Sequence, residues 1–332
     1  MNDRNCSNMR EMLKDCLCEI QSRAEKSSSP VISTGFKPLD DLTGGFEKGK
    51  VYVIGGRPCM GMEEFMLSMI RDILMESRLP VLLFSTNSMK PCYVQRLLSI
   101  HCDIPTLHLY RGLLTSDEWT SLDIGVWTLT DAPLFIHNSL DLPLQELKEN
   151  ADKCIREERT RIVFVDSLQM IDLAKDDRTS SERIAMVMCS LKQLACLFDI
   201  PVVVGSMLSR SIDYREGIEG KKPQLMDLAN SSYIEGLADV IMMVHRSEYY
   251  RIYQDEHGRD LHHLMEIHVL KNSLKPLGSV DLEYHQETGI VTTSKDSAIL
   301  SSTPVSLEEL RIDKQTVKKL IASFDLEKDY PF

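Results

Sequence analysis

The chain contains the segment Val51-Tyr-Val-Ile-Gly-Gly-Arg-Pro-Cys-Met-Gly-Met-Glu-Glu-Phe65, from which its architecture can be worked out. A short apolar strand is expected at residues 51–54, followed by a glycine-bearing loop and a helix that continues to about residue 77. A strand, a glycine-bearing loop and a helix in this order form a phosphate-binding loop, because backbone N–H groups and the helix N-terminus attract anionic oxygens. The segment therefore predicts the scaffold of a nucleotide site.

Two positions of this loop depart from the usual pattern G-x-x-x-x-G-K-[ST]. Gly56 and Gly61 hold the glycine positions, but Met62 replaces the lysine and Glu63 replaces the serine or threonine. The two side chains that normally contact phosphate and magnesium are therefore absent from a loop that otherwise has the expected spacing.

The overall composition limits the class of protein. The chain has 332 residues and a formal net charge of −12, which argues against non-specific binding to nucleic acid. Neither a signal peptide nor a membrane-spanning run of about 20 apolar residues is present. The nine cysteines follow no disulfide-like or zinc-like spacing, so we expect a cytoplasmic protein with reduced thiols.

Apolar segments and helical patterns alternate along the chain, which predicts an α/β fold with a mainly parallel central sheet. Residues 279–284 have the alternating pattern expected of an antiparallel edge strand, and residues 209–226 are expected to form a polar loop. The other expected strands are residues 80–85, 133–137, 161–166, 200–206, 238–245 and 264–270, and the expected helices lie within residues 91–127, 144–158 and 181–198.

The strand at residues 161–166 ends in Asp166. Ligands of parallel α/β sheets bind at the carboxyl ends of the strands, so Asp166 is a candidate Mg²⁺ ligand of the Walker B type. The alternative is that this aspartate caps the following helix.

The two ends of the chain differ from its centre. Residues 8–25 form an amphipathic helical pattern that must pack either on its own domain or on a neighbouring subunit. Residues 294–332 are expected to form a Ser/Thr-rich linker and a short helical, acidic tail. We therefore predict a linker-like helix at 1–30, a domain at 31–293 and a tail at 294–332. The final Asp329-Tyr-Pro-Phe332 is similar to the tip of bacterial single-stranded-DNA-binding proteins, although an ordinary frayed terminus would look the same.

Several short segments of the chain together carry a resemblance to a known family. The segments are Ser33-Thr-Gly-Phe-Lys-Pro-Leu-Asp40, Leu42-Thr-Gly-Gly45, Gly56-Arg-Pro-Cys-Met-Gly61, Pro80-Val-Leu-Leu-Phe-Ser85, Val165-Asp-Ser-Leu-Gln-Met170, Ile200-Pro-Val-Val-Val204, Asp227-Leu228, Ile234-Glu235, Ala238-Asp-Val-Ile241 and His245-Arg-Ser-Glu-Tyr-Tyr250. Over about residues 31–290 they resemble the C-terminal, RecA-like motor domain of DnaB-type replicative helicases, and they occur in the order of that family and at nearly its spacing.

The resemblance implies a RecA-like P-loop NTPase core with antiparallel edge strands, ATP and Mg²⁺ as cofactors, and a hexameric ring. It also implies a linker helix that docks on the adjacent subunit and a place at the nucleoid or replisome. It does not extend to the separate N-terminal helical domain of the family. The nucleotide-binding positions it implies are Gly56, Arg57, Pro58, Cys59, Met60, Gly61, Met62, Glu63, Asp166 and Lys271, with Asp166 as the metal ligand.

Position by position, the catalytic residues of the family are substituted. Its catalytic glutamate falls at Asn87 or Ser88, and neither side chain can act as a general base for water. Its glutamine after the next strand falls at Met207. Lys271 matches the lysine of the family's Lys-x-Arg pair, but Ser273 replaces the arginine that acts as the arginine finger. These substitutions predict that ATP is not hydrolysed at this site.

The loops that contact DNA in the family correspond to residues 209–226 and 227–233. Acidic residues offset the cations of the first loop, so a solvated loop is an equal alternative to a DNA-binding one. The candidate DNA-binding residues are Arg210, Arg215, Lys221, Lys222 and Asn230.

Three functions remain open from the sequence. The chain could be a working ATP-dependent DNA helicase, or a protein-interaction module that uses only its terminal segments. We expect a third possibility, a catalytically degenerate helicase homologue. Such a protein would bind a DnaB-type helicase or other replication proteins, or single-stranded DNA, within a homo- or hetero-oligomeric ring.

Overall fold

A computed structural model describes residues 9–10, 12–14, 16–18, 31–86, 90–140, 142–172, 179–228, 231–273, 275–293 and 299–301. Contacts divide the chain into a unit at Ile32–Thr303 and a second unit made of Met1–Val31 and Pro304–Phe332. In the second unit the described residues between 9 and 18 are helical. None of the helices in the described ranges is long and apolar enough to span a membrane.

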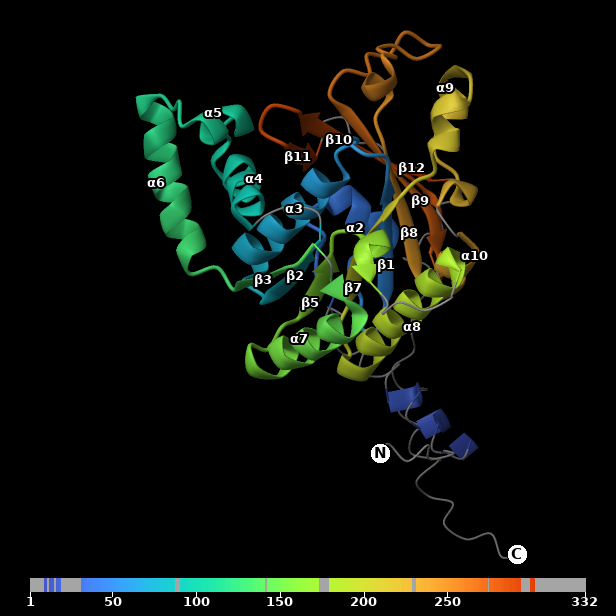
Figure 1. Cartoon of the computed structure of the whole chain (residues 1–332). Helices are drawn as coiled ribbons and strands as arrows, with labels where there is room; N and C mark the ends of the chain where they lie inside the picture. The colour runs from blue at the N-terminus through green and yellow to red at the C-terminus, as the bar shows by residue number, and fades with distance from the viewer. Residues whose placement is uncertain are drawn as a thin grey trace, which may run out of the picture. The chain divides into compact units, whose positions relative to one another are not determined.

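A ten-stranded sheet forms the centre of the larger unit, in the order β11-β10-β9-β8-β1-β7-β5-β2-β3, with β12 paired to β10 (Figure 1). The strands from β8 to β3 in this order are parallel, and β9 to β12 are antiparallel. Their bounds are β1 Val51–Gly56, β2 Val81–Ser85, β3 Leu134–Asn138, β5 Ile162–Val165, β7 Val202–Met207, β8 Val240–His245, β9 Leu264–Asn272, β10 Gly278–His285, β11 Ile290–Thr293 and β12 Ile299–Ser301. A separate two-stranded sheet pairs β4, Leu142–Pro143, with β6, Ile171–Asp172.

The helices cover both faces of the parallel strands, which explains why these strands are almost continuously apolar. Alternate residues of β1 enter two separate cores. Val51 and Val53 pack with α7 (Leu144–Glu157) and α8 (Ser180–Phe198), while Tyr52 and Ile54 pack with α2 (Lys37–Thr43) and α3 (Met62–Asp72). In Figure 1, α4, α5 and α6 form a group beside α3. The helices are α2 Lys37–Thr43, α3 Met62–Asp72, continued by a π-helical turn at Ile73–Ser77, α4 Lys90–Cys102, α5 Thr106–Arg111, α6 Ser116–Thr130, α7 Leu144–Glu157, α8 Ser180–Phe198, α9 Gly217–Lys221 and α10 Ser231–Leu237.

The predicted α/β fold, with a mainly parallel sheet and antiparallel strands toward one edge, is confirmed. Two details were wrong. The segment expected as the edge strand lies within β10, which is flanked by β9 and β11. The segment expected as a polar loop contains α9 and two 3-10 turns, Arg210–Tyr214 and Leu225–Asp227, because Ile212 is buried and anchors it.

Candidate nucleotide site

The predicted loop joins β1 to α3 at the carboxyl edge of the parallel sheet. Its backbone is left-handed at Cys59, with φ 62°, and at Gly61, with φ 95°. The positive φ of Gly61 favours glycine there, and a Cβ at this position would also lie 2.6 Å from the methyl carbon of the flexible Met265 side chain. Pro58 and Cys59 are exposed, whereas Met60 is buried beneath the loop.

Met62 points its side chain into the space below the loop. A Cβ added to Gly56 would lie 2.8 Å from the Met62 Cβ, and one added to Gly205 in β7 would lie 3.2 Å from the Met62 methyl carbon. The thioether therefore runs from Gly56 to Gly205 and packs against the core. An uncharged side chain occupies the position at which the family places its phosphate-binding lysine.

Glu63 is held by an arginine that the sequence did not indicate. Arg96 of α4 donates a hydrogen bond from Nη1 to Glu63 Oε2, and its Nη2 lies 3.7 Å from Glu64 Oε1. Burial opposes the charge of Arg96, but the carboxylates of Glu64 and Glu63 outweigh that effect and raise its pKa. Burial also raises the pKa of Glu64, which favours its neutral form. Glu63, which stands where the family has a magnesium-binding hydroxyl, thus forms an ion pair within the protein.

Asp166 lies directly after β5 and is almost fully buried. The Thr86 N–H, which follows β2, lies 3.0 Å from both carboxylate oxygens, and the Thr86 hydroxyl donates at 2.7 Å. The Tyr93 hydroxyl of α4 donates at 2.6 Å. Burial and the Asp166 charge raise the pKa of Tyr93, so its proton stays available to donate. Protein donors already surround the carboxylate that the family would use for magnesium.

Arg57 is likewise engaged within the chain. Its guanidinium contacts Asp213 at 2.6 and 3.3 Å and donates to the Leu208 carbonyl at 3.0 Å. The Tyr250 hydroxyl also donates to Asp213, at 3.0 Å. Burial opposes ionisation of Asp213, but the hydrogen bonds from Arg57 and Tyr250 outweigh it and lower its pKa. These contacts fix Arg57 against the turn that follows β7.

The loop borders a pocket of about 370 Å³. Besides the loop and Arg96, the pocket is lined by Met207 and by three residues that sequence reasoning missed: Arg246, Tyr284 and Gln286. Arg246 lies in a segment that resembles the family and immediately follows β8, where functional side chains gather at the carboxyl ends of parallel strands, but it was not singled out as a site residue. Nothing in the sequence indicated Tyr284 or Gln286 as site residues. They lie at the end of β10 and just after it, and only the order of the strands in the folded sheet brings them to the pocket.

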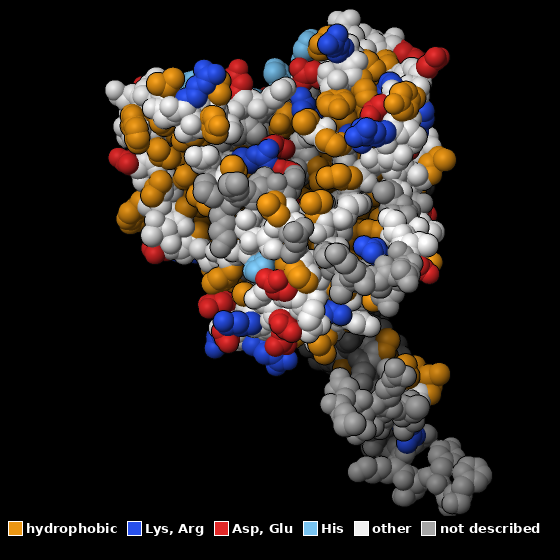
Figure 2. All heavy atoms as spheres, in the orientation of Figure 1, with side chains coloured by type: hydrophobic (Ala, Val, Ile, Leu, Met, Phe, Trp, Pro, Cys, Tyr) orange, Lys and Arg blue, Asp and Glu red, His pale blue; other side chains and the backbone are white. Residues whose placement is uncertain are grey.

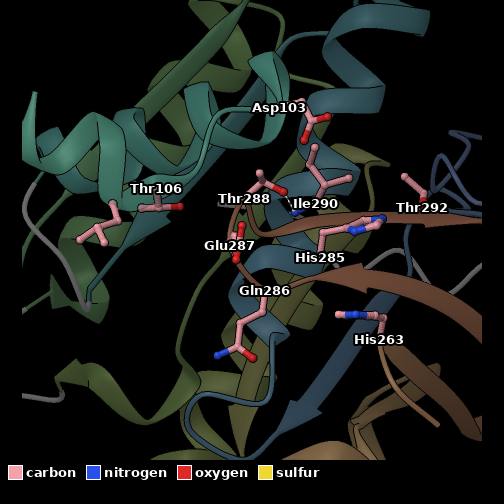
Figure 3. Close-up of a pocket in the computed structure, with 10 residues that line it drawn as sticks. Asp103, Thr106, His263, His285, Gln286, Glu287, Thr288, Ile290 and Thr292 are labelled. Atoms are coloured by element: carbon pink, nitrogen blue, oxygen red, sulfur yellow. Dashed lines mark hydrogen bonds between the residues drawn. The ribbon is translucent and has the colours of Figure 1, made fainter. Parts of the chain in front are cut away.

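A larger pocket of about 970 Å³ adjoins this one and shares Gln286 with it (Figure 3). Asp103 comes from the segment between α4 and α5, and Thr106 is the first residue of α5. The other residues labelled in Figure 3 come from β10, β11, the turn between them and the residue before β9. The rings of His263 and His285 lie 6.2 Å apart on its wall. This pocket has no counterpart among the positions predicted from sequence.

Lys271 and Ser273, at the positions of the family's Lys-x-Arg pair, make contacts inside the chain. Lys271 Nζ donates to the carbonyls of Glu235 and, at 2.6 Å, of Ala238, near the end of α10. The Ser273 hydroxyl donates to the Asp239 carbonyl at 2.8 Å. Asn87 and Ser88, the positions of the catalytic glutamate, lie outside the described residues.

Two of the four candidate DNA-binding cations form ion pairs within the chain. Arg215 forms an ion pair with the buried Asp227, and Lys222 forms one with Glu219 at 2.6 Å. Lys221 donates to the Asp213 carbonyl at 2.7 Å and lies 5.1 Å from the centre of the Tyr250 ring. Arg210 is exposed and has no ion pair within the described ranges, and Asn230 lies outside them. Within the described part of the predicted loops, Arg210 and Lys221 are the candidate cations without an ion pair, and Lys221 is held by the Asp213 carbonyl.

A β-strand, glycine-bearing loop and helix at the carboxyl edge of a parallel sheet are the architecture of a P-loop domain. The family model "DnaB-like helicase C terminal domain" matches residues 31–292, and the chain belongs to this family. A probable replicative DNA helicase of Trieres chinensis is 31% identical over 278 residues, which cover 82% of this chain and 60% of that protein. The replicative DNA helicase DnaB of Treponema pallidum is 30% identical over 277 residues, covering 83% and 59%.

Two solved structures have the same fold. One is an isolated ATPase domain, which aligns with a TM-score of 0.77 and 24% identity, over 88% of this chain and all of that one. The other is a DnaB-like replicative helicase, from a study of its interactions with primase, which aligns with a TM-score of 0.75 and 24% identity, over 89% of this chain and 69% of that one. The chain spans about 60% of the length of the two helicases compared above. It is therefore a homologue of the ATPase domain of DnaB-family replicative helicases.

Proposed function

We propose that this chain is a catalytically degenerate DnaB-type domain that does not hydrolyse ATP and acts as a partner of a DnaB-type helicase in replication. The observation that carries this proposal is the ion pair of Glu63 with Arg96 beside the partly buried side chain of Met62. Where the family pattern has a lysine and a serine or threonine, the loop has the thioether of Met62 and the carboxylate of Glu63. A carboxylate about 4 Å from a phosphate oxygen costs on the order of 4 kcal/mol at an effective dielectric constant of about 20.

The residues of the site do not fit a bound magnesium ion of the family type. Asp166 accepts hydrogen bonds from Thr86 and Tyr93, and Glu63 is paired with Arg96. Magnesium would have to displace donors from a buried carboxylate, which leaves those donors unsatisfied. Ser273 cannot supply the transition-state charge of an arginine finger, which is worth about 10³ to 10⁵ in rate.

A surface on α6 supports the association part of the proposal. Trp119, Ile124 and Trp127 are exposed there, with Trp127 80% exposed, and hydrophobic side chains gather over α5 and α6 in Figure 2. The described N-terminal helical residues Met9 and Met12 are also exposed. Exposed apolar surfaces of this kind mark interaction sites. We propose that the helix within residues 1–30, linked to the domain at 31–293, docks on α6 of a neighbouring subunit in a ring of identical or mixed composition.

Mixing this protein with a DnaB-type helicase is expected to give a complex that co-elutes in size-exclusion chromatography. Trp127→Asp should weaken this association by about tenfold or more, because a charge would be buried in an aromatic contact. Thr128→Asp is the matched control, since it adds the same charge to the neighbouring exposed position. Separate elution of the two wild-type proteins would contradict the proposed partnership.

A further inference from the structure

Two histidines and a glutamate form a buried ionisable cluster on the antiparallel strands. His245 ends β8, and Glu266 and His268 lie on β9, where Glu266 is the residue directly opposite His245. The side chains of His245, Glu266 and His268 are 1%, 15% and 13% exposed. None of the three lines the pocket at the phosphate-binding loop. The cluster is therefore separate from the candidate nucleotide site.

Hydrogen bonds within the cluster do not compensate for its burial. His245 Nε2 lies 3.8 Å from Glu266 Oε2, and His268 Nε2 lies 3.9 Å from Glu266 Oε1, which is too long for a hydrogen bond. His245 Nε2 reaches the Ser247 hydroxyl at 3.3 Å, and the buried His268 Nε2 has no hydrogen-bond partner among the described residues. The charge state of the cluster consequently depends on how well it is shielded from water.

The segment at 209–226 packs against this cluster. The Tyr250 ring stacks on the His245 ring with their centres 6.0 Å apart, and the Tyr250 hydroxyl donates to Asp213 of the segment at 3.0 Å. Lys222 of the same segment is close enough for its charge to act on all three members of the cluster. Detachment of the segment would thus free Tyr250 and remove Lys222, and water would reach the cluster.

Burial shifts the two kinds of group in opposite directions. It lowers the pKa of His245 to about 3 and that of His268 to about 4, so both imidazoles are neutral in the closed structure. It raises the pKa of Glu266 to about 7. The other charged groups that face the cluster form two ion pairs, Lys222 with Glu219 at 2.6 Å and Arg259, before β9, with Asp281 of β10 at 2.7 Å.

We propose that this cluster is an acid-sensitive switch that keeps the segment at 209–226 closed on the sheet at neutral pH and lets it open when the two histidines bind protons. In the open state the imidazoles regain their ordinary pKa of 6.5, so the closed state loses stability as the pH falls below 6.5. Glu266 has the opposite effect, because the closed state loses stability as the pH rises from its ordinary pKa of 4.5 to about 7.

The histidines outweigh the glutamate on the acid side. Between pH 7.5 and pH 5.5 the pKa shifts of His245 and His268 together favour opening by about 100-fold, and the shift of Glu266 opposes it by about 20-fold. The net effect is about fivefold toward the open state. Glu266 thus limits the acid sensitivity that the histidines create.

The test is hydrogen exchange of the whole chain at pH 7.5 and pH 5.5, with each rate divided by the rate of an unstructured peptide at the same pH. Protection of the amides at 209–226 should fall about fivefold in the wild type at pH 5.5, and about 100-fold in Glu266→Gln. His245→Asn combined with His268→Asn should reverse the trend, so that protection rises about 20-fold. His257→Asn is the matched control, since it removes an exposed histidine outside the cluster and should behave as the wild type.

Each other result would overturn the switch. Equal pH dependence of the wild type and Glu266→Gln would contradict the opposing role of the glutamate, and an unreversed trend in the double histidine variant would contradict the role of the histidines. Amides of β1 and β5 in the same samples report on the core, and their loss of protection in parallel with the segment of the wild type would show unfolding instead of local opening. If the double variant does not fold, Glu266→Gln decides the matter alone. ATP hydrolysis enters none of these measurements, so they are independent of the proposed function.

Discussion

Combined replacement of Met62 by lysine and Glu63 by threonine is expected to raise the affinity for ATP with Mg²⁺ by about 100-fold. The change places a cation beside the phosphates and removes a carboxylate from them, and each effect is worth up to about 4 kcal/mol at close range. About 3 kcal/mol of net gain corresponds to the expected factor. Isothermal titration of the variant and the wild type with ATP and Mg²⁺ measures it.

The local packing makes this substitution feasible. Met62 lines the pocket beside the loop and its side chain is unbranched, so an unbranched lysine fits this position. Met62→Leu with Glu63→Gln is the matched control, because it removes the negative charge without adding a cation or a hydroxyl. If the control and the lysine variant bind ATP equally well, the loss of the lysine does not explain the behaviour of the site.

Asp166→Ala is expected to lower the free energy of unfolding by about 3 kcal/mol. The carboxylate is buried and accepts hydrogen bonds from the Thr86 N–H, the Thr86 hydroxyl and the Tyr93 hydroxyl. Each donor left without a partner costs about 1 to 3 kcal/mol. Urea denaturation measures the change, and Tyr93→Phe provides a graded comparison, since it removes one hydrogen bond and should cost about 1 kcal/mol.

The same substitution distinguishes two roles for Asp166. A carboxylate kept for a cation is destabilising in the metal-free protein, because its charge is uncompensated, so its removal would leave stability unchanged or raise it. A carboxylate that holds the ends of β2 and β5 to α4 is stabilising. An Asp166→Ala variant as stable as the wild type in the absence of magnesium would therefore contradict the structural role.

The parallel core was predictable because its signals are local. Each strand is an apolar run bounded by polar or glycine residues, and the loop between β1 and α3 has a recognisable spacing. The edge of the sheet was not predictable in the same way. The alternating pattern of β10 indicates that the two faces of this strand differ, but it does not indicate how many strands flank it. The flanking strand β11 has only four residues, which is too short for a clear pattern in the sequence.

The sequence predicted the residues of the loop but not the other residues that line the site. The substitutions at Met62 and Glu63 follow from spacing alone. The arginines that line the pocket with them do not follow from spacing. Arg96 lies on α4 and Arg246 follows β8, and only the fold brings them to the loop. Asp166 was identified as a candidate ligand from its place after a strand, but its hydrogen bonds with Thr86 and Tyr93 required the fold. Residues that are distant in the sequence and meet only in the fold leave no periodic pattern in a single sequence.

Steady-state ATP hydrolysis by the purified chain, with Mg²⁺ and single-stranded DNA, tests the central claim most directly. A DnaB-type helicase assayed in the same buffer serves as the positive control. We predict no phosphate release above the protein-free background at any protein concentration at which the helicase is active. Release that increases in proportion to the concentration of this chain would contradict the proposed loss of catalysis, and Met62 and Glu63 would then have to be compatible with a working site.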